Sequence, residues 1–347
     1  MKVMVKVLHI GQMVGGLDTY IRNIIDYTSD GFEFVPNDSI KLCRQLNPLN
    51  DLIALIQAIR TIKKEKPDVI HCHSAKGGFI GRWAGYLTGV RTLYTPHAFS
   101  FLCTESKWKR RFYIWLERLA RLNSYLLACS ESEQMLGINV VHYRREKVQV
   151  WHNAVPDAAK LIADSDETKP YICYVGRPSY QKNTFFLLDV VKEVHKKHPE
   201  VKFYLLGVGY YSPDTEKMKQ KISEYGLEDA FEMVTWLSHE KTLELLRDSL
   251  FYLSVSRYEG LPLSVIETMA LGKAILASDV VGNRDCVKDS ENGYLLPLEV
   301  KTFVEKTCLL IEDVKLREKM GKKSRSLFED HFYINHRIKV LEEIYKN

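Results

Sequence analysis

The sequence lacks the segments that would place it in or across a membrane. Its longest apolar runs, such as LFYLSVS, are far shorter than the roughly 20 residues that a membrane-spanning helix needs. The opening residues, MKVMVKVLHIG, contain neither the long apolar stretch nor the small-residue cleavage site of a secretory signal peptide. We therefore expect a cytoplasmic protein.

Several catalytic and metal-binding signatures are also missing. No H-E-x-x-H, G-x-S-x-G or P-loop motif occurs, and GQMVGGLDTY is not the G-x-G-x-x-G fingerprint of a nicotinamide-binding loop. The seven cysteines are scattered with no C-x-x-C pair, a pattern typical of buried, reduced thiols. The only D-x-D, at 164–166, lies in a polar stretch, and His71 and His73 have no third ligand nearby in the sequence. We expect no metal and no cofactor, with His73 near the functional site and His71 structural.

What is present is an ordinary globular composition with a repeating order of elements. The 347 residues, 46% hydrophobic and 27% charged, suggest about two domains. Short apolar runs alternate with amphipathic stretches, as βαβ units with parallel sheets do. The predicted strands are 6–11, 68–73, 91–96, 124–130 and 147–153 in the first half, and 171–176, 202–207, 231–236, 250–256 and 274–278 in the second.

The pattern predicts an α/β protein made of two doubly wound, Rossmann-like domains that face each other across a cleft. We expect an N-terminal domain over 1–155, a linker over 156–170, and a second domain over 171–330. A helix over 331–347 would pack back toward the first domain.

The net charge of +5 is divided unevenly, with +8 in residues 1–155 and −3 in the remainder. Much of the basic excess lies in SKWKRRFYIWLERLARLNS, at 106–124, where cations alternate with aromatic residues. Such a helix suits an anionic membrane surface. The alternative is a solvated helix whose Trp115, Leu116 and Leu119 pack on the sheet. The predicted membrane contacts are Lys107, Trp108, Lys109, Arg110 and Arg111.

Three loops that follow predicted strands carry residues suited to an anionic sugar ligand. Gly15 and Gly16 would let backbone amides approach a phosphate. Arg177 and Lys182 are two cations that could clamp a diphosphate. The segment SVSRYEGLPLSVIETMALG places Glu259 before a helix start and Glu267 within that helix, and carboxylates accept hydrogen bonds from diols.

These residues carry a resemblance to a family. The string EGLPLSVIETMALG looks like the E-x7-E signature of glycosyltransferase family 4, retaining enzymes of the GT-B fold. Further segments match in the family's order over nearly the whole chain, namely GGLDTY, PDVIHCHSAKGGFIGRWAG, YTPHAFSF, CSESE, HNAVP, VGRPSYQKN and NGYLLP. The nearest likeness is to enzymes of bacterial capsule, O-antigen and exopolysaccharide synthesis. The stretch between Tyr27 and Leu49 is shorter than is usual in the family, so we expect the second strand of the first domain to be trimmed.

The resemblance implies roles for individual residues. It assigns Arg177 and Lys182 to the donor diphosphate, Glu267 to the ribose, and Glu259 to the donor sugar. It adds Gly15 and Gly16 beside the donor phosphate, with Gly16, His73 and His97 on the acceptor side, and makes His97, Arg177, Lys182 and Glu259 the catalytic group. The residues at the predicted helix start complete the donor site, namely Gly260, Leu261, Pro262, Leu263 and Ser264.

The function implied is metal-independent transfer of a hexosyl group with retention, from a nucleotide-sugar, by family habit a UDP-sugar, to a lipid-linked saccharide. His97 would orient the sugar rather than act as a base. The partners expected are this donor, this acceptor and an anionic membrane surface, with no nucleic acid. Two alternatives remain open. One is a UDP-sugar epimerase of the same architecture, and the other is a non-catalytic protein that binds nucleotides or polyanions.

Overall fold

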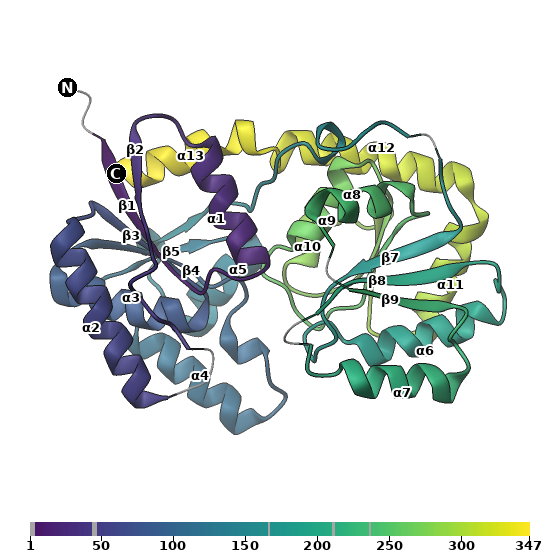
Figure 1. The fold of residues 1–347 in the computed structure, drawn as a ribbon, viewed down its shortest axis with the longest axis horizontal. Coiled ribbons are helices and arrows are strands. Elements are labelled where there is room, and N and C mark those ends of the chain that lie inside the picture. Colours follow the sequence, from purple (N-terminus) through teal and green to yellow (C-terminus); the bar gives the residue numbers. More distant parts are fainter. Residues whose placement is uncertain (1–3, 44–46, 166, 210–211, 236) are drawn as a thin grey trace. The chain divides into compact units, whose positions relative to one another are not determined.

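The computed structural model describes residues 1–347 except 1–3, 44–46, 166, 210–211 and 236. The chain forms two compact units. Unit 1 comprises Met1–Pro156 together with Ile334–Asn347, and unit 2 comprises Asp157–Tyr333. Each unit is an α/β domain built on its own parallel sheet, and each is described by itself below (Figure 1).

The sheet of unit 1 has the strand order β2-β1-β3-β4-β5-β6 within the described residues, and every neighbouring pair is parallel. Its strands are β1 (Val5–Ile10), β2 (Phe32–Val35), β3 (Val69–His73), β4 (Arg91–Thr95), β5 (Tyr125–Ala128) and β6 (Val148–Val150). Its helices are α1 (Gly16–Tyr27), α2 (Pro48–Glu65), α3 (Ser74–Thr88), α4 (Lys107–Leu119), α5 (Glu131–Leu136) and α13 (Ile334–Lys346).

The sheet of unit 2 has the order β12-β11-β10-β7-β8-β9 within the described residues and is again parallel throughout. Its strands are β7 (Tyr171–Val175), β8 (Lys202–Val208), β9 (Phe231–Thr235), β10 (Tyr252–Ser254), β11 (Ile275–Ser278) and β12 (Gly293–Leu296). Its helices are α6 (Thr184–His195), α7 (Thr215–Tyr225), α8 (His239–Asp248), α9 (Leu263–Ala270), α10 (Asn283–Cys286), α11 (Val300–Glu312) and α12 (Val314–His331).

The ten predicted strands all correspond to strands of the structure, which confirms the α/β prediction, although residue 236 of the predicted 231–236 strand lies outside the described residues. Two strands were not on the predicted list. β2 is the strand that we expected to be trimmed, and β12 lies within the segment NGYLLP. Both are four-residue strands at a sheet edge. Edge strands are often short, so they leave a weak apolar signal in the sequence.

Helix α3 lies unusually close to its sheet because one of its faces is built of glycine. A Cβ on Gly78 would come within 2.1 Å of the Tyr94 ring, and one on Gly81 within 2.2 Å of the Cys72 sulfur. The segment SAKGGFIGRWAG therefore encodes close packing of this helix on β3 and β4.

Each strand order reverses direction at one place, and there loops from neighbouring strands leave the sheet on opposite sides. In unit 1 this switch point lies between β1 and β3, and in unit 2 between β7 and β10. Open α/β sheets bind ligands at the carboxyl ends of the strands at such a point. The fold thereby selects two loop clusters, one in each unit, as candidate sites.

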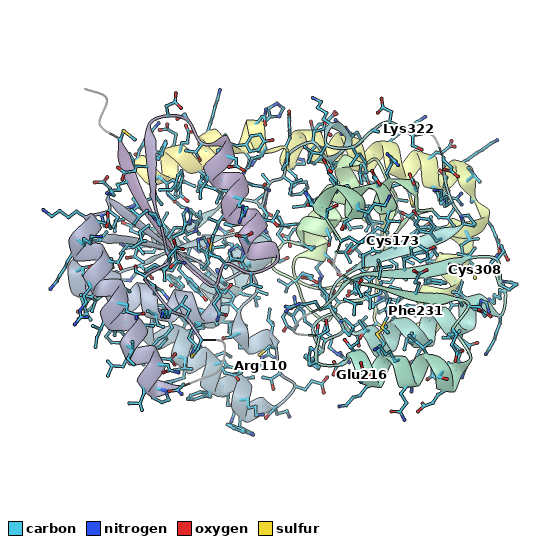
Figure 2. All side chains as sticks on the ribbon, viewed as in Figure 1. Arg110, Cys173, Glu216, Phe231, Cys308 and Lys322 are labelled. Atoms are coloured by element: carbon cyan, nitrogen blue, oxygen red, sulfur yellow. The ribbon has the colours of Figure 1, made fainter. Side chains whose placement is uncertain are left out.

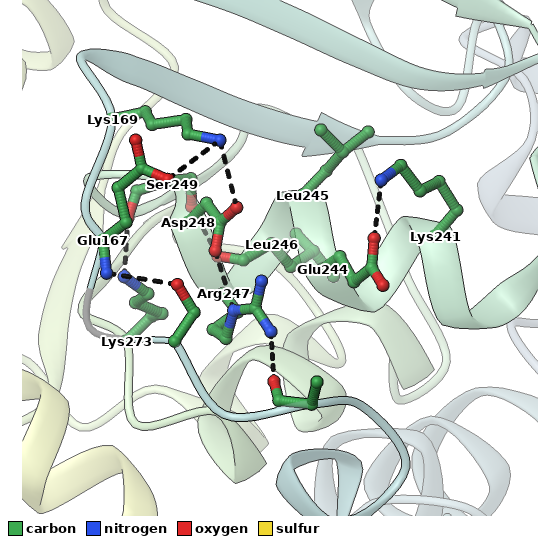
Figure 3. A network of polar contacts seen from close by, with 12 residues as sticks. Glu167, Lys169, Lys241, Glu244, Leu245, Leu246, Arg247, Asp248, Ser249 and Lys273 are labelled. Atoms are coloured by element: carbon green, nitrogen blue, oxygen red, sulfur yellow. Dashed lines mark hydrogen bonds and ion pairs between the residues drawn. The ribbon is translucent and has the colours of Figure 1, made fainter.

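A network of polar contacts holds the opposite, N-terminal edge of the sheet in unit 2 (Figure 3). The Lys169 backbone N–H donates to the Asp248 carbonyl oxygen at 2.8 Å, and the Lys273 ammonium donates to the Ser249 carbonyl oxygen at 2.7 Å. Burial lowers the pKa of Lys273 to about 8. These contacts tie together the residues that precede β7, β10 and β11.

The predicted linker differs from the structure. Asp157 is buried and accepts two hydrogen bonds from the Arg325 guanidinium at 2.6 and 2.7 Å, so the residues after Pro156 already belong to unit 2. The predicted 331–347 helix begins instead at Ile334, as α13. It packs on α1 and β1 of unit 1, and the yellow α13 lies beside α1 in Figure 1.

The cysteine prediction holds for five residues, including Cys173 in the interior of the unit 2 sheet (Figure 2). It is wrong for Cys103, which is exposed, and for Cys43, which is only partly buried. All seven carry free thiols.

Candidate active site

At the switch point of unit 2, the loop after β7 meets the loop after β10. The Lys182 ammonium lies 2.7 Å from Oε1 of Glu259, and both side chains are largely buried. The two residues are 77 positions apart in the chain. Because β7 and β10 are neighbours in the sheet, the fold brings together a cation and a carboxylate that the sequence analysis assigned separately.

Neighbouring groups hold this ion pair in place. The Gln181 amide donates to Oε2 of Glu259 at 3.1 Å, and the Tyr174 hydroxyl donates to the Lys182 carbonyl oxygen at 2.7 Å. Burial, followed by the Glu259 charge, raises the pKa of Tyr174 well above its usual range, so its hydroxyl stays protonated. A Cβ on Gly176 would lie 2.9 Å from three carbons of the Lys182 side chain, so glycine leaves room for that stem.

Helix α9 begins beside the ion pair. Pro262 occupies the position before its first residue, and no side chain caps the helix there. The backbone N–H groups at such a start, together with the helix dipole, attract phosphate. The predicted donor residues Gly260, Leu261 and Pro262 lie in the turn before this helix, and Leu263 and Ser264 are its first two residues.

Glu267 lies on α9 and is paired with a residue that the sequence analysis did not single out. Its Oε1 is 2.7 Å from Nε2 of His239, at the start of α8. The hydrogen bond to Glu267 raises the pKa of His239 above its usual value, although burial acts in the opposite direction. Arg177 lies half-buried in the loop after β7, five residues before Lys182 in the chain.

At the switch point of unit 1, Gly15 and Gly16 form the turn between β1 and α1. Gly15 has φ of 61°, a left-handed conformation that favours glycine, and it occupies the cap position of α1 without a side-chain cap. A Cβ on either glycine would meet no atom within 4 Å, so both positions face open space. A ligand group could therefore approach this backbone closely.

Histidines from β1, from β3 and from the loop after β4 gather at the same edge. Nδ1 of His9 lies 2.8 Å from Nε2 of His73, and Nδ1 of His73 lies 3.2 Å from Nε2 of His97. Burial lowers the pKa of His9 and of His97 to about 3, and that of His73 well below its usual value. The rings are therefore neutral at physiological pH.

This cluster corrects the expectation that His71 and His73 have no third ligand nearby. The two side chains lie on one face of β3, as residues two apart in a strand do, and a third histidine is close, because His9 pairs with His71 across β1 and β3. Nitrogen atoms of His9, His71 and His73 all lie within 4.8 Å of one another, a spacing that could hold a metal ion. Their ring nitrogens, apart from Nε2 of His9, already take part in hydrogen bonds with protein groups.

The backbone around these histidines is strained. Ser74, His97 and Ala98 all have a positive backbone φ, between 52° and 83°, a conformation that residues other than glycine rarely adopt. Buried Glu133 holds the segment, since it accepts hydrogen bonds from the N–H groups of Ala98 at 2.8 Å and Cys129 at 2.9 Å. In the sequence, Glu133 could have been found from the S-x-x-E pattern within CSESE, which is typical of a helix start. Ser130 is the N-cap of α5, and Glu133 is the third residue of that helix.

Helix α4 has an apolar stripe that faces solvent. The alternative expectation that Trp115 and Leu119 pack on the sheet is therefore wrong. Trp108, Phe112, Trp115 and Leu119 recur at helical spacing and are 69%, 43%, 55% and 42% exposed. Lys107, Lys109 and Arg111 border the stripe and are exposed as well. Arg110 is also exposed, but it lies seven residues before the buried Glu117 and therefore on the opposite side of the helix. The helix is bounded by Lys107 and Leu119, shorter than the predicted 106–124.

Across the described residues, the structure has no helix that combines the length and the hydropathy required to span a bilayer.

Solved structures identify the architecture. The crystal structure of Anabaena HepE in complex with UDP and glucose superimposes with a TM-score of 0.81 at 17% identity, covering 99% of this chain and 100% of that one. Sucrose-phosphate synthase from Thermosynechococcus elongatus gives the same TM-score and identity, over 99% and 98% of the two chains. The fold is therefore the GT-B fold.

Sequence comparisons name the family. A family profile for Glycosyltransferase Family 4 matches residues 14–159, and one for Glycosyl transferases group 1 matches residues 158–327. The chain belongs to glycosyltransferase family 4. A relative from Escherichia coli, UDP-Gal:alpha-D-GlcNAc-diphosphoundecaprenol alpha-1,3-galactosyltransferase, is 27% identical over 93% of this chain and 86% of its own length. An uncharacterized 41.2 kDa protein in the cps region of Klebsiella pneumoniae is 28% identical over 84% and 86%.

Proposed function

We propose that this glycosyltransferase moves a hexosyl group, with retention and without a metal ion, from a UDP-sugar to a lipid-linked saccharide in cell-surface polysaccharide synthesis. The observation that carries the proposal is the buried Lys182–Glu259 pair at the switch point of unit 2, beside the uncapped start of α9. The Escherichia coli relative, whose name gives a UDP-sugar donor and a diphospholipid-linked acceptor, supports the choice of substrates.

The ion pair fits a site that must hold a charged donor. Before the donor binds, Lys182 and Glu259 neutralise each other, which limits the cost of keeping two charges largely out of water. When the donor binds, Lys182 and Arg177 contact the diphosphate, and Glu259 accepts hydrogen bonds from the sugar hydroxyls. Gln181 keeps the Glu259 carboxylate oriented during this exchange, through its hydrogen bond to Oε2.

Catalysis in this proposal is electrostatic. Charge develops on the leaving β-phosphate, and Lys182, Arg177 and the N–H groups at the start of α9 stabilise it. The acceptor hydroxyl gives its proton to a leaving phosphate oxygen on the same face of the sugar, so the new bond forms where the old one breaks. No protein nucleophile and no protein base is needed for this step.

The test is transfer by the purified protein from a panel of UDP- and GDP-sugars to lipid-diphosphate saccharides. We expect product only when both substrates are present, with the anomeric configuration of the donor by NMR and an unchanged rate in EDTA. Turnover of a UDP-sugar without acceptor would instead indicate an epimerase, and nucleotide binding without turnover would indicate a binding protein. Inversion or loss of activity in EDTA would contradict the proposed mechanism.

The His239–Glu267 contact predicts a pH dependence of donor binding. If the ribose hydroxyls take the place of His239 on Glu267, binding releases the proton that Glu267 helps His239 to retain. The affinity should therefore rise several-fold as the pH increases through the raised pKa of His239 and level off above it. A UDP-sugar should be used, since its diphosphate does not titrate in this range. In His239→Gln we expect a flat profile; an equal slope in both proteins would refute the exchange.

We also propose that the protein binds the membrane surface that carries its acceptor, through the basic border and apolar stripe of α4. Replacing Arg111 by glutamate should weaken binding to vesicles with anionic lipid about tenfold or more, since each cation near such a surface contributes about 1 kcal/mol. Flotation in low and high salt measures this. The control is Lys322→Glu, the same charge change on α12 of unit 2 (Figure 2). Equal effects of the two variants would exclude α4 as the contact.

A further inference from the structure

The buried histidines of unit 1 form a hydrogen-bonded chain whose direction can be worked out from the number of available protons. A neutral imidazole carries one N–H donor and one acceptor nitrogen. His9, His73 and His97 are neutral, because burial lowers the pKa of each. His73 is bonded through both nitrogens, so it must donate at one and accept at the other. Both hydrogen bonds therefore run in the same direction along the chain.

The neighbouring ring of His71 shows that such proton counting gives a definite answer here. The Thr95 hydroxyl donates its only proton to the Leu127 carbonyl oxygen at 2.8 Å. It must therefore accept from Nε2 of His71, which lies 2.8 Å away, so His71 carries its proton on Nε2. Nδ1 of His71 then accepts from the Tyr345 hydroxyl at 2.8 Å. His71 does not contribute a hydrogen bond to the chain of the other three.

The His9 end of the hydrogen-bonded chain determines the direction in which the hydrogen bonds run. Nε2 of His9 is buried and has no hydrogen-bond partner among the described residues. If the chain ran from His97 to His9, this atom would be a buried N–H without an acceptor, which proteins rarely tolerate. If the chain runs from His9 to His97, the same atom is only an unused acceptor. The second arrangement has the smaller penalty.

We propose that His9 and His73 are positioning residues that hold His97 in the tautomer protonated at Nδ1, so that His97 presents a hydrogen-bond donor to an oxygen of the transferred sugar. Nε2 of His97 is occupied as an acceptor from His73. In this tautomer, Nδ1 of His97 cannot take a proton from the acceptor hydroxyl. The identity of the oxygen as a sugar oxygen rests on the proposed function, whereas the tautomer itself does not.

The direct test is long-range ¹H–¹⁵N NMR of the protein labelled at histidine, without substrate, with single histidine variants for assignment. We expect the Nδ1–H pattern at His9, His73 and His97 and the Nε2–H pattern at His71, which serves as the internal reference. An Nε2–H or a cationic His97 near pH 7.5 would overturn the proposal. This result is readable even if no nucleotide-sugar is turned over, an outcome that would refute the proposed function instead.

A remote pair of variants tests whether the tautomer matters for transfer. His9→Leu removes the first donor of the chain, so we expect mixed tautomers at His97 and a kcat/KM about tenfold lower, the effect of losing about one hydrogen bond. His9→Asn, which places an amide where Nδ1 stood, should restore most of the activity. Tyr345→Phe is the matched control, since it removes the buried Tyr345 hydroxyl that is hydrogen-bonded to His71 in the same core. Equal losses in His9→Leu and Tyr345→Phe with an unchanged His97 spectrum would mean a structural role only and would overturn the proposal.

Discussion

Replacing Lys182 by alanine is expected to lower kcat for sugar transfer by about 10²–10³, the usual effect of removing one group that stabilises a developing oxyanion. The ammonium lies at the switch point of unit 2, 2.7 Å from Glu259 and beside the start of α9. Initial rates at saturating donor and acceptor measure the change. A variant that kept its kcat within about threefold would remove Lys182 from the leaving-group site.

The design must separate lost catalysis from a destabilised site, because Lys182→Ala leaves the largely buried Glu259 without its partner. The double variant Lys182→Ala/Glu259→Gln removes both charges, so it should recover thermal stability but not activity. Lys196→Ala is the matched control for charge. Lys196, at the C-terminal end of α6, forms an exposed ion pair with Glu193. This variant should keep full activity.

Replacing Glu117 by alanine is expected to cost about 3–5 kcal/mol of the stability of unit 1, because it leaves a buried arginine without its carboxylate. Glu117 is the buried residue of α4, and its Oε2 accepts from Nη2 of Arg82 at 2.9 Å. Arg82 is 1% exposed, and its guanidinium carbon lies 3.8 Å from the centre of the Tyr94 ring. The same ring's hydroxyl donates to Oε1 of Glu117 at 3.0 Å.

Urea unfolding monitored by tryptophan fluorescence measures this effect. The signal reports mainly on unit 1, which contains Trp83, Trp108, Trp115 and Trp151. Glu117→Gln retains hydrogen-bonding capacity and should lose less. Glu131→Ala is the exposed control, since Glu131 is 60% exposed in its pair with His152 and should cost under about 1 kcal/mol. A loss in Glu117→Ala no larger than this control would mean that α4 does not depend on the buried pair.

The location of Glu117 also matters for the membrane proposal. The side of α4 that faces the core is held by a buried ion pair, whereas its exposed side carries four large apolar residues. The alternative to membrane contact placed the apolar side chains of this helix on its buried face, as the hydrophobic pattern of a water-soluble helix suggests. Because a charged pair occupies the core instead, this pattern gave the wrong face for Trp115 and Leu119.

The histidine cluster shows a second limit of sequence reasoning. The spacing of His71 and His73 already implies one face of a strand. The order of residues along the sequence, however, does not place His9 opposite His71, because this pairing depends on the register between β1 and β3. His239 was missed for a related reason, since its partner Glu267 lies on another helix.

The sequence by itself determined the two α/β domains, the positions of most strands, the loops that hold Arg177, Lys182 and Glu259, and the helix that holds Glu267. Apolar runs and glycine turns are local signals, so they can be read in order along the chain. Only the tertiary structure decided which of these groups touch. The reversal of strand order brings the loops after β7 and β10 together, and with them Lys182 and Glu259. Pairing between distant residues follows from sheet topology and register, which no local pattern contains.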